Sequence, residues 1–331
     1  MSLQAQGVYF TDNDIEWCDQ RAEILSGLSQ YPRRISSKYF YDEVGSKLFE
    51  DITELPEYYP TRMEIQLLEN YQDEIANAAG EDCVLVEYGS GASKKIQVLL
   101  DSIRPAAYVP LDISKTFLID SAVALKKRFP WLNIHASCVD YQQPVTLPET
   151  LPKGLRANQQ TVAFFPGSSL GNFDPKGAMS FLTNVRKTVG SKGALLIGLD
   201  LVKPHRVLNA AYNDSQGVTA EFNLNILRHL NALGRGSFNL EYFEHDAFFN
   251  GMDSRIEMHL VSKIDQVVTL FDRSFSFKCD ERIVTEYSYK FEIDRFAGMA
   301  WQAGFRCQHV WSDAGSNYAL IWLASREDWG D

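Results

Sequence analysis

The fold is decided by the stretch CVLVEYGSGASKK at residues 83–95. An apolar run ends in an acidic residue and a Gly-Ser-Gly turn, and the apolar residues that follow, up to Ile103, have helical spacing. The pattern predicts a strand, a tight loop and a helix. Glycines let the backbone come close to a ligand, and the first turn of a helix presents free N–H groups. Open α/β sheets hold nucleotide-like cofactors in this way.

The loop is an incomplete dinucleotide fingerprint. That fingerprint reads Gly-x-Gly-x-x-Gly, and here Lys94 stands three residues after Gly91. By itself the loop is therefore also consistent with an ordinary strand-to-helix turn. If a ligand binds, the missing third glycine favours a single nucleoside over a dinucleotide. S-adenosylmethionine is then the favoured cofactor, and NAD is the lesser alternative.

Two further units repeat the plan. Residues 107–114 predict a second strand that carries Asp112, about 20 residues beyond the glycines, where a ribose-binding acid is expected. Residues 132–139 predict a third strand, which is followed by Asp140. Three successive strands that end in glycine or acid favour a cofactor lying across the carboxyl edge of a parallel sheet. We expect Asp112 to accept hydrogen bonds from both ribose hydroxyls and Asp140 to accept one from the adenine amino group.

Composition narrows the class of protein. A chain of 331 residues with 45% hydrophobic content predicts a globular protein of one large or two modest domains. A formal net charge of −11 argues against nucleic acid or an anionic membrane as the partner and favours a small-molecule substrate. Neither a transmembrane-length apolar run nor a signal-peptide pattern is found, so we expect a cytoplasmic location.

The chain continues with two more strands of the same kind. Residues 161–173 predict a fourth strand that opens into a glycine- and serine-rich turn, just past the switch point of the sheet. Asn172 in this turn can accept from an amine and donate to a carboxylate, although it could instead cap the next helix. Residues 193–200 predict a fifth strand, and Lys203-Pro204 marks a boundary after it.

Beyond that boundary the α/β alternation breaks and later returns. A helix over 220–233 and alternating strands over 254–261 and 281–291 predict an inserted domain. The first domain then resumes with a helix over 293–303 and an antiparallel pair of strands over 305–311 and 318–324. Such a late antiparallel pair closes a seven-stranded methyltransferase sheet.

The N-terminal segment is dense in aromatic residues over 38–62, which is consistent with a lid over a pocket or with a helical subdomain that covers the core. Pro60 is expected to keep Tyr59 out of the helix that runs from Met63 to about Ala79. We predict an α/β fold with two domains. They are a Rossmann-like seven-stranded class I methyltransferase domain that binds S-adenosylmethionine, residues 63–202 plus 290–331, and a second α+β substrate-binding or lid domain, residues 1–62 plus 203–289.

Several motifs in a fixed order carry a resemblance to a known family. They are FYD at 40–42, LPEYYPTR at 55–62, EYGSGASKK at 87–95, FPGS at 165–168 with Gly171-Asn172, AAYND at 210–214 and TEYS at 285–288. Together they resemble the histidine Nα-methyltransferases of ergothioneine biosynthesis, from about residue 30 to the C-terminus. The resemblance implies transfer of three methyl groups from S-adenosylmethionine to the α-amine of L-histidine, giving hercynine, without a metal. Nothing in the sequence demands more than a monomer.

The resemblance also implies a role for individual residues. Seven would hold the cofactor: Tyr41, Gly89, Ser90, Lys95, Asp112, Asp140 and Tyr141. Three would hold the amine and carboxylate of the substrate: Tyr58, Asn172 and Tyr212. Glu286 and Ser288 would read the imidazole, Met258 would pack beside the ring, and Phe49 and Thr219 would line the pocket. Methyl transfer would depend on Tyr41, Tyr58, Asn172 and Tyr212.

Other interpretations of the same residues remain open. From periodicity alone, Met258 could be an ordinary core methionine and Glu286 could face solvent. The pocket could accept another amino acid, such as tryptophan, and histidine specificity rests on Glu286. The chain could also be a non-catalytic module that binds the cofactor, or an NAD-linked oxidoreductase.

Overall fold

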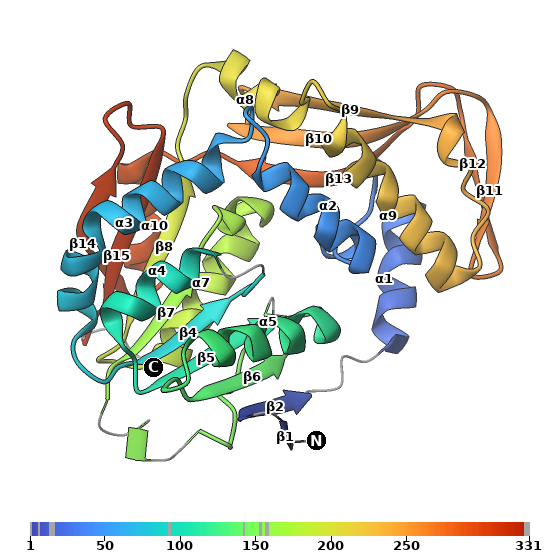
Figure 1. The fold of residues 1–331 in the computed structure, drawn as a ribbon. Helices are drawn as coiled ribbons and strands as arrows, with labels where there is room; N and C mark the ends of the chain where they lie inside the picture. Colours follow the sequence, from blue (N-terminus) through green and yellow to red (C-terminus); the bar gives the residue numbers. More distant parts are fainter. Residues whose placement is uncertain are drawn as a thin grey trace. The chain divides into compact units, whose positions relative to one another are not determined.

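The computed structural model describes residues 2–5, 7–12, 17–91, 94–141, 143–151, 154–155 and 159–327. The chain divides into two compact units (Figure 1). Unit 1 comprises Met1–Ile15, Pro60–Val202 and Phe291–Asp331, and unit 2 comprises Glu16–Tyr59 and Lys203–Lys290.

Unit 1 is built on a largely parallel sheet. Its strands are β1 (Ser2–Ala5), β2 (Val8–Asp12), β4 (Val84–Tyr88), β5 (Ala107–Asp112), β6 (Ile134–Cys138), β7 (Thr161–Phe165), β8 (Ala194–Asp200), β14 (Phe305–Ser312) and β15 (Tyr318–Ser325). Its helices are α3 (Tyr59–Ala79), α4 (Lys94–Ile103), α5 (Lys115–Arg128), η2 (Ser169–Asn172), α7 (Pro175–Val189) and α10 (Ile293–Gln302).

The strand order confirms the predicted Rossmann-like class. The nine strands lie in the order β1-β2-β6-β5-β4-β7-β8-β15-β14. The chain moves outward from β4 through β5 to β6 and then returns to the other side of β4 with β7, so β4 and β7 flank the switch point. The last pair, β14 and β15, is antiparallel, as predicted.

Helices cover both faces of this sheet, which is why its central strands are apolar throughout. Helices α3, α4 and α5 bury their apolar sides on one face, and α7 and α10 bury theirs on the other. All residues of β4 and β8 are buried. Helix α7 begins where the sequence marks it, because Asp174 accepts a hydrogen bond from the Gly177 amide at 2.7 Å and Pro175 follows it.

The N-terminus corrects the prediction in two respects. The seven predicted strands are present, and β1 and β2 extend the sheet to nine. Residues 1–62 were also predicted to belong wholly to the second domain, but β2 pairs in parallel with β6 and belongs to unit 1. Val8 and Phe10, two residues apart, are buried, so the alternation of this short strand gives the physical reason for its pairing.

The start of α3 is a further correction. The helix begins at Tyr59 and includes Pro60, although Pro60 was predicted to exclude Tyr59 from it. In the first turn of a helix the missing N–H of proline breaks no hydrogen bond, because no helical carbonyl stands four residues earlier. Proline is therefore tolerated at this position.

Unit 2 is α+β. Its helices are α1 (Trp17–Ser29), η1 (Ser37–Phe40), α2 (Glu43–Thr53), α8 (His205–Tyr212), α9 (Val218–Gly234) and η3 (Leu240–Tyr242). Its strands are β3 (Arg33–Arg34), β9 (Phe243–Asn250), β10 (Arg255–Ser262), β11 (Gln266–Leu270), β12 (Arg273–Phe277) and β13 (Arg282–Tyr289). Four strands form a sheet in the order β3-β13-β10-β9, and β11 pairs with β12 separately. Helix α9 packs on β9 and β10, and α2 packs on α9 (Figure 1).

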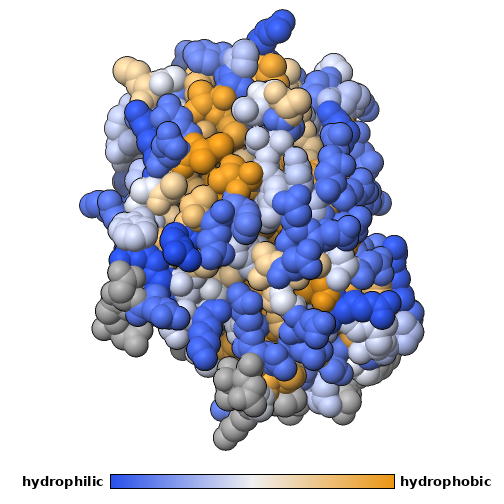
Figure 2. Space-filling view, turned by 90° about the vertical axis from the view of Figure 1, so that its left-hand side faces the viewer, coloured by the Kyte–Doolittle hydropathy of each residue, from blue (hydrophilic) through white to orange (hydrophobic). Residues whose placement is uncertain are grey.

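The surface is mostly polar on the side shown in Figure 2. Hydrophilic residues predominate there, and hydrophobic residues gather in a patch in the upper half of that view. Among the helices of the described residues, none combines the length and the apolar character needed to cross a membrane.

Candidate active site

The glycine loop of unit 1 turns back over the end of β5. Gly89 and Gly91 have φ of 73° and 31°, a region that glycine enters without steric cost. The amides of Gly89 and Ser90 both donate to the Leu111 carbonyl, at 2.9 and 3.1 Å. A Cβ at Gly89 would lie 3.3 Å from the Tyr141 hydroxyl, so a side chain at this position would crowd that ring. The loop therefore brings its backbone close to the ends of two neighbouring strands.

Acidic residues follow β5 and β6 at the same edge. The Asp112 carboxylate accepts from the Ser114 amide at 2.8 Å and from the Gly91 amide at 3.4 Å. Burial raises the pKa of Asp112 above its ordinary value, and these backbone hydrogen bonds oppose the shift. Burial raises the pKa of Tyr141 as well, and the charges of Asp112 and Asp140 add to the effect, so the three groups act on one another. The structure thus brings Gly89, Asp112, Asp140 and Tyr141 together.

Ser90 supplies the observation that fits a ligand here. Its side chain is 4% exposed, and its hydroxyl has no hydrogen-bond partner among the described residues. A buried hydroxyl without a partner costs about 1–3 kcal/mol, and a bound polar molecule would remove that cost. Together with a close-approach glycine loop and two carboxylates, it fits a nucleoside-containing cofactor such as S-adenosylmethionine.

Lys95, predicted to hold the cofactor, forms an ion pair with a carboxylate of the protein. Its ammonium is 2.6 Å from the carboxylate of Glu64, a residue of α3 that is fully buried. Glu64 also accepts from the Gly167 amide at 2.8 and 3.1 Å. This pair ties α3 and α4 to the loop after β7. Glu64 was not singled out from the sequence, because its partners are distant along the chain.

Asn172 ends the 3-10 helix η2 in the loop after β7. It is half-buried and does not cap α7, because Asp174 takes that position. The alternative role as a helix cap is therefore wrong. By its place after β7, Asn172 stands at the same edge of the sheet as the glycine loop after β4, on the other side of the switch point.

Unit 2 gathers the aromatic residues that the family resemblance singled out. Tyr41 contacts Phe49 with ring centroids 5.7 Å apart, Phe49 contacts Tyr58 at 6.3 Å, and Tyr58 contacts Tyr212 at 6.4 Å, each edge to face. Tyr41 thus belongs to unit 2, whereas the other predicted cofactor residues belong to unit 1. These four rings, which we call the aromatic row, come from three segments of the sequence.

The predicted specificity residues share one face of the unit 2 sheet. Met258 on β10 stands directly opposite Glu286 on β13, and Ile256 stands opposite Ser288, so these side chains lie on the same face. Met258 is 1% exposed, whereas Glu286 is half-buried. In the part of the chain that the structure describes, no group donates a hydrogen bond to the Glu286 carboxylate. Burial raises the pKa of Glu286 to about 7, and the positive charge of Lys290 opposes this shift.

A buried polar cluster adjoins Glu286. Tyr212 on α8 donates to the Ser288 hydroxyl at 2.9 Å, and Lys290 donates to the same hydroxyl at 2.9 Å and to the Tyr212 hydroxyl at 3.1 Å. All three residues are less than a tenth exposed. Lys290 was not predicted from the sequence, although Glu286, Ser288 and Lys290 follow one another at intervals of two residues, the spacing of one face of a strand.

Thr219, predicted to line the pocket, lies in the first turn of α9. It is buried, and its amide donates to the Asp214 carboxylate at 2.8 Å, so Asp214 satisfies the first turn of the helix. Hydrogen bonds from several amides hold the pKa of Asp214 below its ordinary value against the effect of burial.

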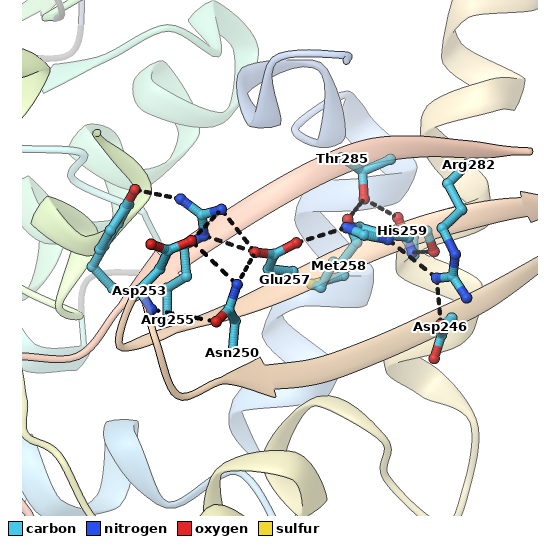
Figure 3. A network of polar contacts seen from close by, with 11 residues as sticks. Asp246, Asn250, Asp253, Arg255, Glu257, Met258, His259, Arg282 and Thr285 are labelled. Atoms are coloured by element: carbon cyan, nitrogen blue, oxygen red, sulfur yellow. Dashed lines mark hydrogen bonds and ion pairs between the residues drawn. The ribbon is translucent and has the colours of Figure 1, made fainter. Parts of the chain in front are cut away.

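The opposite face of the same sheet carries a chain of contacting charged and polar side chains (Figure 3). Arg255 and Asn250 donate to the Glu257 carboxylate at 2.8 and 3.0 Å. Glu257 contacts His259 at 3.1 Å, and Arg282 lies between His259 and Asp246. Acidic side chains join the basic ones of this network, which suits it to stabilising the sheet, and the predicted specificity residues lie on the other face.

Comparison with known proteins finds a matching family over most of the chain. The model of the family "Histidine-specific methyltransferase, SAM-dependent" matches residues 20–325. A histidine N-alpha-methyltransferase of Mycolicibacterium smegmatis is 38% identical over 91% of this chain and 93% of its own length. One of Mycobacterium tuberculosis is 36% identical over the same shares.

A solved structure shows the same fold. A S-adenosylmethionine-dependent methyltransferase from Clostridium acetobutylicum aligns with a TM-score of 0.50 and 9% identity, over 85% of this chain and 98% of that chain. The family match confirms the predicted resemblance, the enzyme class and S-adenosylmethionine as the cofactor. The roles of individual residues stay predictions. This chain belongs to the family of histidine-specific, S-adenosylmethionine-dependent methyltransferases.

Proposed function

We propose that the protein transfers three methyl groups from S-adenosylmethionine to the α-amine of L-histidine and so makes hercynine, the first step of ergothioneine biosynthesis. The family match and the relatives named histidine N-alpha-methyltransferase support histidine as the substrate. The observation that carries the proposal is the half-buried Glu286, a carboxylate to which no described residue donates, two residues before the buried hydroxyl of Ser288. An acceptor and a hydroxyl at this spacing match the two ring nitrogens of an imidazole.

Residues of unit 1 are suited to hold the cofactor. In this proposal Asp112 and Asp140 accept hydrogen bonds from it, Ser90 gains the partner that its hydroxyl lacks, and the glycine loop allows close approach. Lys95 acts beside Glu64, which already neutralises its charge. When bound, S-adenosylmethionine supplies an electrophilic methyl group on a sulfonium sulfur.

The chain's own residues have two tasks in this chemistry. The first is to hold the amine nitrogen in line, which Tyr58, Tyr212 and Asn172 would do through their polar atoms. The second is to leave that amine unprotonated. A phenol or water beside it can take the proton, and low-polarity surroundings disfavour the ammonium form.

The aromatic row suits the product. Successive methylations remove N–H donors and end in a fixed positive charge. The faces of Tyr41, Phe49 and Tyr58 could stabilise that cation by roughly 0.5–2 kcal/mol. The contacts along the row hold these rings at defined angles to one another.

Mass spectrometry of the products tests the proposal. The protein is incubated with S-adenosylmethionine and an equal mixture of the common amino acids, and mass gains of one, two and three methyl groups are sought. We expect trimethylated histidine and no other methylated amino acid. Methylation of tryptophan instead would keep the enzyme class and reject the substrate. No product at all would favour a non-catalytic module that binds the cofactor.

A further inference from the structure

Lys290 is a buried cation among residues that are proposed to bind the substrate. It is 5% exposed and follows the last residue of β13. Its ammonium donates to the Ser288 hydroxyl at 2.9 Å and to the Tyr212 hydroxyl at 3.1 Å, and it lies 5.0 Å from the centre of the Tyr212 ring. A lysine ammonium has three N–H donors and no acceptor, so its neighbours must turn lone pairs toward it.

The hydrogen bonds around Ser288 determine what it can offer a ligand. Its oxygen accepts from Lys290 and from Tyr212, and a serine oxygen has two lone pairs. Both are therefore in use, and among the described residues none accepts the hydrogen of the Ser288 hydroxyl. Tyr212 gives its own hydrogen to Ser288. What remains for a ligand is a hydrogen on Ser288 and no lone pair.

Glu286 offers a ligand lone pairs, whereas Ser288 offers a hydrogen. It lies two residues before Ser288 on the same face of β13, and when ionised it can only accept hydrogen bonds. A neutral imidazole has one N–H and one nitrogen with a free lone pair, so it can donate to Glu286 and accept from Ser288. An imidazolium would set a second N–H against the hydrogen of Ser288. An indole has no unprotonated ring nitrogen and would leave Ser288 without a partner.

We infer that Lys290 is a positioning residue that makes Ser288 a donor toward the substrate, and that it thereby selects the unprotonated imidazole nitrogen of histidine. The inference rests on the proposed function. Lys290 acts through Ser288 and Tyr212 and needs no contact with the substrate.

A double-mutant cycle tests this inference by titration calorimetry with L-histidine in the presence of S-adenosylhomocysteine. Lys290→Met and Ser288→Ala should each weaken histidine binding about tenfold or more, because each removes the oriented donor. If Lys290 acts through Ser288, the double variant should bind no more weakly than Ser288→Ala alone. Losses that multiply would overturn the inference, because Lys290 would then act independently of Ser288.

Two controls separate positioning from structural damage. Lys203→Met removes another buried lysine that donates to a tyrosine hydroxyl, that of Tyr59 at 2.9 Å, and it should leave histidine affinity unchanged. Lys290→Arg keeps a buried donor cation and should retain affinity within a few-fold. If Lys290→Met does not fold, Lys290→Gln takes its place in the cycle. Equal loss of histidine affinity in Lys203→Met would contradict a specific role for Lys290.

A pyrrole analogue of histidine gives a second readout. It keeps a ring N–H but has C–H in place of the unprotonated nitrogen. The parent protein should bind it about tenfold or more weakly than histidine, and Ser288→Ala and Lys290→Met should lose this discrimination. Discrimination that persists in both variants would overturn the inference. If the parent binds no histidine, both the proposed function and this inference fail. If the parent binds histidine but the affinity losses of the two single variants multiply in the double variant, only this inference fails.

Discussion

Two carboxylates, one in each unit, differ in what surrounds them. Glu64 in unit 1 is fully buried, and it has a lysine ammonium at 2.6 Å and a backbone amide at 2.8 Å. Glu286 in unit 2 is half-buried, and no described group donates to it. Burial raises the pKa of Glu286 to about 7, against the opposing charge of Lys290. Glu64 is thus the more buried of the two and has its partners within the protein, whereas Glu286 keeps its acceptor oxygens available, as expected of a carboxylate that binds a ligand.

The comparison predicts that the same substitution acts in opposite directions in the two units. A glutamine at position 64 would leave the Lys95 ammonium without its counter-ion inside the protein. A glutamine at position 286 would remove a charge that the folded state solvates poorly. The first change should harm folding, and the second should harm ligand binding while favouring folding.

The largest expected effect is on unfolding. Glu64→Gln should lower the free energy of unfolding by about 3 kcal/mol, because breaking one side of a buried ion pair strands the other charge. Urea unfolding followed by circular dichroism measures it. Glu69→Gln on the exposed side of the same helix is the matched control and should change stability by less than about 0.5 kcal/mol. A loss as small as that of the control would show that Glu64 contributes little to stability.

The next effect is on substrate affinity. Glu286→Gln should weaken L-histidine binding about 30-fold, since a hydrogen bond to a charged group contributes about 1.5–3 kcal/mol. Calorimetry in the presence of S-adenosylhomocysteine measures it, and affinity for S-adenosylhomocysteine itself should not change. If the variant binds histidine as tightly as the parent does, specificity does not depend on Glu286.

The smallest expected effect is a gain in stability. At pH 8, without ligand, Glu286→Gln should raise the free energy of unfolding by about 1 kcal/mol after allowance for partial exposure. The folded-state pKa of Glu286, about 7, lies above the ordinary glutamate pKa of 4.5. The parent therefore loses stability as pH rises through this window, and the advantage of the variant should shrink as pH falls from 8 toward 5. Denaturant unfolding at several pH values measures it. An advantage that grows toward pH 5 would reverse the sign of the argument.

The same comparison shows what the sequence could predict. The meeting of the glycine loop, Asp112 and Asp140 at one edge of unit 1 could be predicted, because each stands at or just after the end of a strand and parallel strands bring such positions to one edge. The short strand β2 was missed because it has only two buried apolar residues. The pair of Glu64 and Lys95 was missed because no local pattern links a residue inside one helix to the start of another.

Unit 2 was harder to predict from residue patterns. Its candidate site draws on α2, α8, β10 and β13, and only the family resemblance connected those segments. The strands β10 and β13 were found from their alternation, but β9 was not predicted, because charged and polar residues interrupt its apolar ones. Lys290 was overlooked because a lysine after a strand usually faces water, whereas here it is buried between two hydroxyls.

The most direct test of the central claim is the dissociation constant of L-histidine between pH 5 and 8, with S-adenosylhomocysteine present, for the parent and for Glu286→Gln. If an ionised Glu286 reads a neutral imidazole, binding requires that Glu286, with its pKa of about 7, and the imidazole, with a pKa of about 6.5, both be deprotonated. Below pH 6 the dissociation constant of the parent should then rise by nearly two logarithmic units for each unit by which the pH falls. That of the variant should rise by only one. The same slope in both proteins would contradict the claim, because Glu286 would not take part in histidine recognition as a carboxylate.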